Sequence, residues 1–126
     1  MKKTIFLSSV LALGLASVVF ASALAAAFKW VETEHRFGQI QQGKPVTATF
    51  KFTNSGAEPL LISSARGSCG CTGVEYPKEP ISPGASGEIK ATFNAVAVGP
   101  FTKSVMVESN VESGTTTLQI QGEVVQ

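Results

Sequence analysis

Residues 45–56 read PVTATFKFTNSG, and this stretch decides the fold because its apolar and polar residues alternate. Its apolar side chains share one parity: Val46, Ala48, Phe50 and Phe52. Threonines and Lys51 occupy the positions between them. Since successive side chains of a strand point to opposite faces, this period of two collects the apolar side chains on one face. The turn formers Asn54-Ser55-Gly56 follow, so the pattern predicts a half-buried strand that ends near them.

Four further strands are predicted toward the C-terminus. They cover residues 60–65, residues 88–93, a segment with Phe101, Val105 and Val107 facing inward, and a segment with Leu118, Ile120 and Val124 facing inward. A loop at residues 109–114 separates the last two. Residues 26–34 leave two interpretations open, a first edge strand or a loose lead-in.

Proline and glycine mark the breaks between these strands. Pro83-Gly84 suits the two central positions of a type II turn, because proline fixes the first φ and glycine accepts the positive φ of the second. Gly99-Pro100 predicts another break directly before Phe101.

These features predict an all-β fold, a single immunoglobulin-like antiparallel β-sandwich after an N-terminal signal peptide. No stretch after the leader shows a helical period with caps. The usual disulfide between the two sheets is absent, because the only two cysteines are one residue apart. Hydrophobic burial therefore has to hold the sheets together. We expect Trp30 to pack over a sheet end rather than to stack on a ligand.

The first residues have the character of an export leader. Lys2 and Lys3 precede an uncharged apolar stretch, and Ala23-Leu24-Ala25 matches the A-x-A cleavage pattern. We therefore predict a signal peptide over residues 1–25 and one domain over residues 26–126, exported to the periplasm or secreted. The alternative is an uncleaved membrane anchor, since about 20 apolar residues can span a bilayer.

The charge balance restricts the class of partner. The chain has 10 basic and 9 acidic residues, and removal of Lys2 and Lys3 leaves 8 against 9, a net charge near −1. No basic stripe remains, which argues against nucleic acid and against anionic membrane surfaces as partners. Contact with a membrane is expected only if the leader stays uncleaved.

The pair Cys69-Gly70-Cys71 is the chain's most unusual chemical feature. Side chains at i and i+2 of an extended chain point to the same side, so both sulfurs can reach one point. A disulfide across one glycine is one interpretation, and its loop is too small to stabilise the fold much. The others are two thiols that shape a turn, and a redox or metal site.

A metal site at Cys69 and Cys71 favours Cu(I), which is soft and accepts low coordination. Tetrahedral zinc needs two more ligands. His35, the only histidine, is distant in sequence and expected to be solvated, while Met106 has the parity opposite to its inward-facing neighbours. If the pair binds a metal, we expect Cu(I), and otherwise we expect no cofactor.

No catalytic constellation is evident, so we do not expect an enzyme. A serine triad would depend on His35, and no G-x-S-x-G motif is present. Glu75 and Glu79 lie in a segment expected to be a solvated loop, which argues against a glycosidase pair.

An ordered set of motifs runs through the chain: Phe37-Gly38, Gly43, Phe50-Lys51-Phe52-Thr53-Asn54-Ser55-Gly56, Pro59-Leu60, Ser68-Cys69-Gly70-Cys71-Thr72, Pro83-Gly84 and Ser109-Asn110. With its C-G-C-T core, this set resembles the bacterial domain-of-unknown-function 1573 family over about residues 34–125. The resemblance implies an exported immunoglobulin-like sandwich, similar to the domains of the abnormal-spindle and Hydin group. It implies no established activity, and no residue roles are carried over from it.

The sequence therefore predicts a non-enzymatic binding or structural module of the bacterial envelope. Its partner is expected to be an envelope protein or a surface component. The alternative is a thiol-active protein that uses Cys69 and Cys71 for Cu(I) binding or disulfide exchange.

Overall fold

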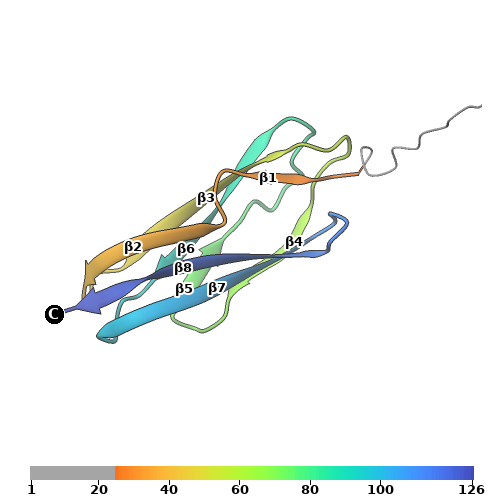
Figure 1. Cartoon of the computed structure of the whole chain (residues 1–126). Coiled ribbons are helices and arrows are strands. Elements are labelled where there is room, and N and C mark those ends of the chain that lie inside the picture. Colours follow the sequence, from red (N-terminus) through yellow and green to blue (C-terminus); the bar gives the residue numbers. More distant parts are fainter. Residues whose placement is uncertain (1–24) are drawn as a thin grey trace, which may run out of the picture.

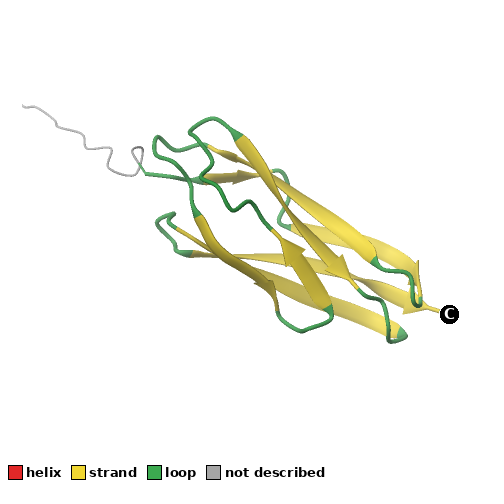
Figure 2. Cartoon of the chain, turned by 180° about the vertical axis from the view of Figure 1, so that it is seen from behind, coloured by secondary structure: helices red, strands yellow, loops and turns green. Residues whose placement is uncertain are grey.

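The computed structural model describes residues 25–126, which form two four-stranded sheets packed face to face (Figure 1). The strands are β1 (Phe28–Trp30), β2 (Glu34–Gln41), β3 (Val46–Asn54), β4 (Ile62–Gly67), β5 (Thr72–Glu75), β6 (Ser86–Phe93), β7 (Gly99–Ser109) and β8 (Thr115–Val125). Only strands and loops occur in this part of the chain (Figure 2). The all-β prediction is confirmed. The predicted signal peptide at residues 1–25 lies, apart from Ala25, outside the described residues.

The strand order is β1-β3-β6-β5 in the first sheet and β2-β8-β7-β4 in the second. Every neighbouring pair is antiparallel except β2 and β8, which are parallel. The exception arises at the start of the domain, where the chain crosses from β1 in one sheet to β2 in the other without turning back. The predicted antiparallel sandwich is thus confirmed in class, with one parallel pair along an edge.

The alternation in residues 45–56 produces β3 as predicted. Ala48, Phe50 and Phe52 are buried to 1% exposure or less, while Lys51 is exposed. The central pairing with β6 places Phe50 opposite Ile89 and Ala48 opposite Ala91. The apolar face of the first sheet therefore meets the inward-facing residues of the second sheet in one core.

The other four predicted strands are also present, with shifted ends. The strand predicted at residues 60–65 begins at Ile62 and continues to Gly67, and Leu60 forms an isolated bridge with Ile81. Residues 26–34 contain the short edge strand β1. Trp30 lies on β1 and packs against Phe52, with ring centroids 5.2 Å apart, so its packing role is confirmed.

The two turn predictions have opposite outcomes. The amide of Ala85 donates to the carbonyl of Ser82 at 2.9 Å and Gly84 has φ +82°, so the turn at Pro83-Gly84 is confirmed. The predicted break at Gly99-Pro100 is wrong, because β7 begins at Gly99 and Pro100 pairs with Glu123. Proline is compatible with the beginning of a strand, and the break lies earlier, in residues 94–98.

Strands β2 and β5 were not predicted. In β2 the pairing with β8 shifts between Arg36 and Gln39, next to Gly38 at φ +73°. Such a bulge interrupts the period of two. Strand β5 has only four residues, too few for a pattern to be recognised. Within residues 25–126, no helical segment has the length and hydropathy of a membrane crossing.

Asn54, the last residue of β3, is a fully buried polar residue that joins several segments. Its side-chain oxygen accepts hydrogen bonds from the amides of Gly56 at 2.9 Å and Ala27 at 3.3 Å. Its side-chain nitrogen donates to the carbonyls of Glu58 at 2.8 Å and Ile81 at 2.9 Å. All four hydrogen bonds of this amide are therefore made inside the protein.

The main chain of Asn54 makes two more bonds. Its amide donates to the carbonyl of Ala85 at 2.9 Å, and its carbonyl accepts from the amide of Gly84 at 2.7 Å. Asn54 therefore forms hydrogen bonds with three segments: the start of the domain, the β3–β4 loop and the turn before β6.

We expect Asn54→Leu to lower the free energy of unfolding by about 3 kcal/mol, because leucine is similar in size but leaves several buried partners unsatisfied, at about 1–3 kcal/mol each. Urea denaturation of the purified domain measures the change. Asn94→Ala is the control, since Asn94 is exposed and its side chain makes one hydrogen bond, to the amide of Val96. Equal effects of the two substitutions would contradict the role assigned to Asn54.

Candidate functional site

The cysteine pair lies where the chain passes from one sheet to the other. Residues 68–71 connect β4, the edge strand of the second sheet, to β5, the edge strand of the first. Ser68 donates its amide to the carbonyl of Ser104 at 2.9 Å, and its hydroxyl accepts from the amide of Ser104 at 3.2 Å. At the other end, the amide of Asn94 donates to the carbonyl of Cys71 at 3.1 Å. The loop is therefore held to both sheets.

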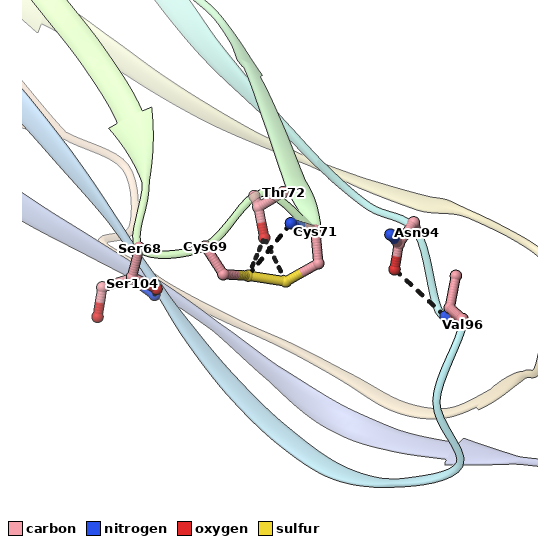
Figure 3. The surroundings of a disulfide bond; sticks show 7 residues. All are labelled: Ser68, Cys69, Cys71, Thr72, Asn94, Val96 and Ser104. Carbon is pink, nitrogen blue, oxygen red and sulfur yellow. Dashed lines mark hydrogen bonds between the residues drawn. A yellow bond between two sulfur atoms is a disulfide. The ribbon is translucent and has the colours of Figure 1, made fainter.

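Within this loop, the structure joins Cys69 and Cys71 through their sulfur atoms, with the two Cα atoms 5.3 Å apart (Figure 3). The amide of Cys71 donates to Sγ of Cys69 at 3.3 Å, and the amide of Thr72 approaches the carbonyl of Cys69 at 3.4 Å. The Thr72 hydroxyl lies 4.0 Å from Sγ of Cys69 and 3.9 Å from Sγ of Cys71. Both cysteines are half-buried, and Cys71 packs against the core.

Thr72 is one of only two buried polar residues of the described chain, and its position depends on Gly67. A Cβ atom on Gly67 would lie 2.8 Å from Cβ of Thr72 and 3.0 Å from its carbonyl oxygen. Gly67 therefore allows the end of β4 to lie directly against the start of β5. This close approach fixes the loop between them.

A cavity of about 290 Å³ adjoins the cysteine pair. Cys71, Phe93 and Phe101 line it, together with Val96, Val98 and Lys103. Val96 is 62% exposed and Val98 is 52% exposed, so both present apolar surface to solvent. The cavity thus combines one cysteine of the pair, an apolar wall and one cation.

The loop at residues 94–98 that carries these valines is well anchored. The amide of Gly43 donates to the carbonyl of Ala95 at 2.8 Å, and the side chain of Gln42 donates to the carbonyl of Val96 at 2.9 Å. Ala95 is fully buried and has φ +56°, the single positive φ of a described residue other than glycine. Alanine in this region costs free energy, and such strain tends to gather at functional sites.

A larger hollow of about 510 Å³ lies on the outer face of the first sheet, where Lys51, Thr53, Ser86 and Glu88 are among the lining residues. It contains neither a thiol nor an imidazole. We therefore take the cavity beside Cys71 as the candidate site.

His35 and Met106, which the sequence argued against as further metal ligands, lie on strands away from the cysteine pair. His35 is on β2, where Nδ1 is 3.1 Å from Oε2 of Glu32 and the ring contacts Phe37 edge-on. Met106 is 43% exposed on β7, opposite Arg66. Residues 25–126 contain no cluster of three or more His, Cys, Asp or Glu side chains that could hold a metal ion. A Cu(I) site would use only Cys69 and Cys71, and only as thiolates.

The sequence drew attention to the cysteines but missed the loop at residues 94–98. Its run NAVAV has two valines of the same parity with no strand to carry them. Two valines in a segment between two predicted strands are a usable signal, because a loop without function is usually polar.

The fold and this site define an immunoglobulin-like β-sandwich with a cysteine pair at the crossing between its sheets. The chain belongs to the family described as "Protein of unknown function (DUF1573)", whose model matches residues 28–124. The resemblance predicted from the sequence is confirmed, and the match begins six residues earlier than predicted, at 28 instead of 34. No curated protein matches the chain.

Several solved structures share the fold. A protein of unknown function from Porphyromonas gingivalis W83 matches with TM-score 0.69 at 16% identity, over 81% of this chain and 48% of that chain. The PapD-like domain 7 of human CEP192 matches with TM-score 0.64 at 11% identity, over 94% of this chain and 98% of the domain. The VesB protease of Vibrio cholerae matches with TM-score 0.63 at 17% identity, over 79% of this chain and 32% of the protease.

This chain spans about half of the Porphyromonas gingivalis protein and about a third of the protease. At these identities the similarity shows the fold alone. The immunoglobulin-like prediction is confirmed, and the function has to be argued from the site.

The close contact between Gly67 and Thr72 leads to a prediction. Gly67→Ala should lower the free energy of unfolding by about 1–3 kcal/mol, because the new methyl group collides with Thr72. Gly73→Ala is the matched control, since a Cβ there meets nothing within 4 Å, and its effect should stay within about 0.5 kcal/mol. Thermal and urea denaturation of both variants provide the comparison. A Gly67→Ala protein as stable as the control would show that the loop adjusts freely.

Proposed function

We propose that this protein is an exported, non-enzymatic binding module of the bacterial envelope. Its contact surface is what we term the disulfide face, made of Cys71, Val96, Val98, Pro100 and Lys103. The observation that carries the proposal is the pair of exposed valines on an anchored, strained loop beside the cavity. Exposure of apolar side chains to water is unfavourable, and an anchored loop cannot rearrange to bury them. Their exposure therefore indicates a surface that a partner covers.

The size of the site favours a macromolecular partner over a free small molecule. The cavity has a volume of about 290 Å³, which is at the lower limit of the volumes of small-molecule pockets, about 300 Å³. Complete burial of one valine contributes about 1.5–3 kcal/mol, whereas association costs about 4–15 kcal/mol. Two half-exposed valines are therefore insufficient alone, and a partner has to contact the surrounding loops as well. A protein surface that inserts one side chain into the cavity meets this requirement.

Cross-linking in living cells tests the contact surface. With a photoreactive amino acid in place of Val98, we expect one discrete cross-linked protein, and we expect Val96→Asp to abolish it by placing a charge at the contact. Val31 is the matched control position, since it is a more exposed valine, at 78%, and lies outside the disulfide face. Identical products from positions 98 and 31, or none at 98, would refute the proposed surface.

Export and the oxidation state of the cysteines are tested by one measurement. The intact mass of the protein recovered from the envelope fraction should correspond to residues 26–126, lacking two hydrogen atoms because of one disulfide. The Cys69→Ser, Cys71→Ser double variant should show the same cleavage without that deficit. Recovery of the unprocessed chain in the cytoplasm would exclude export, and a dithiol mass would favour the Cu(I) alternative.

A thiol-active protein is the second candidate. It is favoured by the position of Cys71, which is half-buried and yet lines an open cavity. A disulfide between residues two apart encloses too small a loop to stabilise the fold greatly. Its presence is therefore better explained by reactivity than by stability.

A further inference from the structure

The two residues of the cysteine pair have different surroundings. Cys71 lines the cavity, and its carbonyl is held by the amide of Asn94. Cys69 is not among the cavity residues, and its sulfur instead accepts the amide hydrogen of Cys71 at 3.3 Å. Figure 3 shows Cys71 between Cys69 and the segment that carries Asn94 and Val96. A group bound in the cavity would therefore meet Cys71 first.

We propose that the cavity receives a cysteine of a partner polypeptide, flanked by apolar side chains, and that its thiolate attacks Sγ of Cys71. A bond forms between the partner sulfur and Cys71, while the Cys69–Cys71 bond breaks and Cys69 leaves as a thiolate. This step conserves charge and electrons, because one thiolate replaces another. The proposal rests on the second candidate function and uses the disulfide face defined for the first.

The hydrogen bonds around Cys69 determine which sulfur leaves. When the bond opens, Sγ of Cys69 keeps the Cys71 amide as a donor. The Thr72 hydroxyl lies 4.0 Å from Sγ of Cys69 and 3.9 Å from Sγ of Cys71, so it does not distinguish the two sulfurs. Hydrogen bonds to a thiolate favour the charged form, and a sulfur that is stable as a thiolate leaves faster. No backbone amide is directed at Sγ of Cys71 among the hydrogen bonds of the described residues.

The cavity wall determines the kind of thiol that is accepted. Phe93, Val96, Val98 and Phe101 supply apolar surface, and Lys103 is the only charged residue of the lining. A nearby cation favours the thiolate of an approaching cysteine. The site therefore suits a cysteine between apolar neighbours and disfavours one between carboxylates, whose charges would be desolvated against the valines.

A partner with two cysteines completes the reaction. Its second thiolate attacks the partner sulfur of the mixed disulfide, and Cys71 leaves as a thiolate. The partner dithiol loses two electrons and becomes a disulfide, and the Cys69–Cys71 bond gains those electrons and becomes a dithiol. The co-reactant is thus a protein dithiol, and the direction is oxidation of the partner.

The test uses the purified oxidised protein and two synthetic peptides, each with one cysteine, flanked in one by leucines and in the other by glutamates. After a short reaction, free thiols are alkylated in acid and the products are mapped by mass spectrometry. We expect the peptide on Cys71, the alkyl group on Cys69, and a rate about tenfold higher for the leucine peptide. A peptide attached to Cys69, or equal rates for both peptides, would overturn the proposal.

Two variants separate the cavity from general thiol reactivity. Lys103→Gln should slow the reaction with both peptides, and the Val96→Ser, Val98→Ser double variant should slow only the leucine peptide. Lys90→Gln is the control, since Lys90 is an exposed residue of β6 outside the cavity. Circular dichroism verifies that each variant is folded. Unchanged rates in the folded cavity variants would overturn the proposal.

Failure of the exchange proposal can be distinguished from failure of the proposed binding surface. If the peptides do not react but the cross-link at Val98 persists, the exchange proposal is overturned and the binding surface remains. If the peptides react at Cys71 and no cross-link forms, the exchange chemistry is supported without the binding-module function.

Discussion

The structure depends on the burial of one amide side chain, that of Asn54, at the end of the first sheet. A buried amide without partners would cost several kcal/mol, so the segments around it have to supply two donors and two acceptors in fixed positions. Ala27, Gly56, Glu58 and Ile81 supply them. This requirement holds the start of the domain and the β3–β4 loop against the turn before β6. The pairing of β3 with β6, and of β6 with β5, then fixes the position of the other end of the sheet, where the cysteine pair lies.

The sequence predicted the faces of the strands better than their neighbours. Period-two alternation identifies which side of β3 is buried, because the pattern lies within the strand and needs no knowledge of the neighbouring strands. It does not predict Asn54, since asparagine before serine and glycine is typical of a turn, and only the folded chain shows its four partners. The bulge at Gly38 removed the pattern that would have revealed β2. The parallel pairing of β2 with β8 likewise depends on the path of the chain, which alternation does not encode.

The same distinction applies to the candidate site. Cys69 and Cys71 were identified from sequence because they are the only two cysteines of the chain and lie one residue apart. Their neighbour Asn94 is more than twenty residues away and reaches Cys71 only because β5 and β6 pair in one register. The cavity formed with Val96 and Val98 could not be predicted without that pairing. The pair also lies outside the core, so its bond can open without removal of a buried apolar side chain.

The parallel pairing of β2 and β8 determines how the domain would bear a mechanical load. The start of β1 and the C-terminus lie toward opposite ends of the sandwich (Figure 1). In the second sheet, β2 is an edge strand and β8 is its neighbour. A pull on the N-terminal end of β2 and on the C-terminal end of β8 would draw the two parallel strands past each other in opposite directions. Six residue pairs, from Glu34 with Gln119 to Gln41 with Val125, would then share the force together instead of opening one after another. An arrangement of this kind resists stretching because the hydrogen bonds between the two strands are loaded in shear.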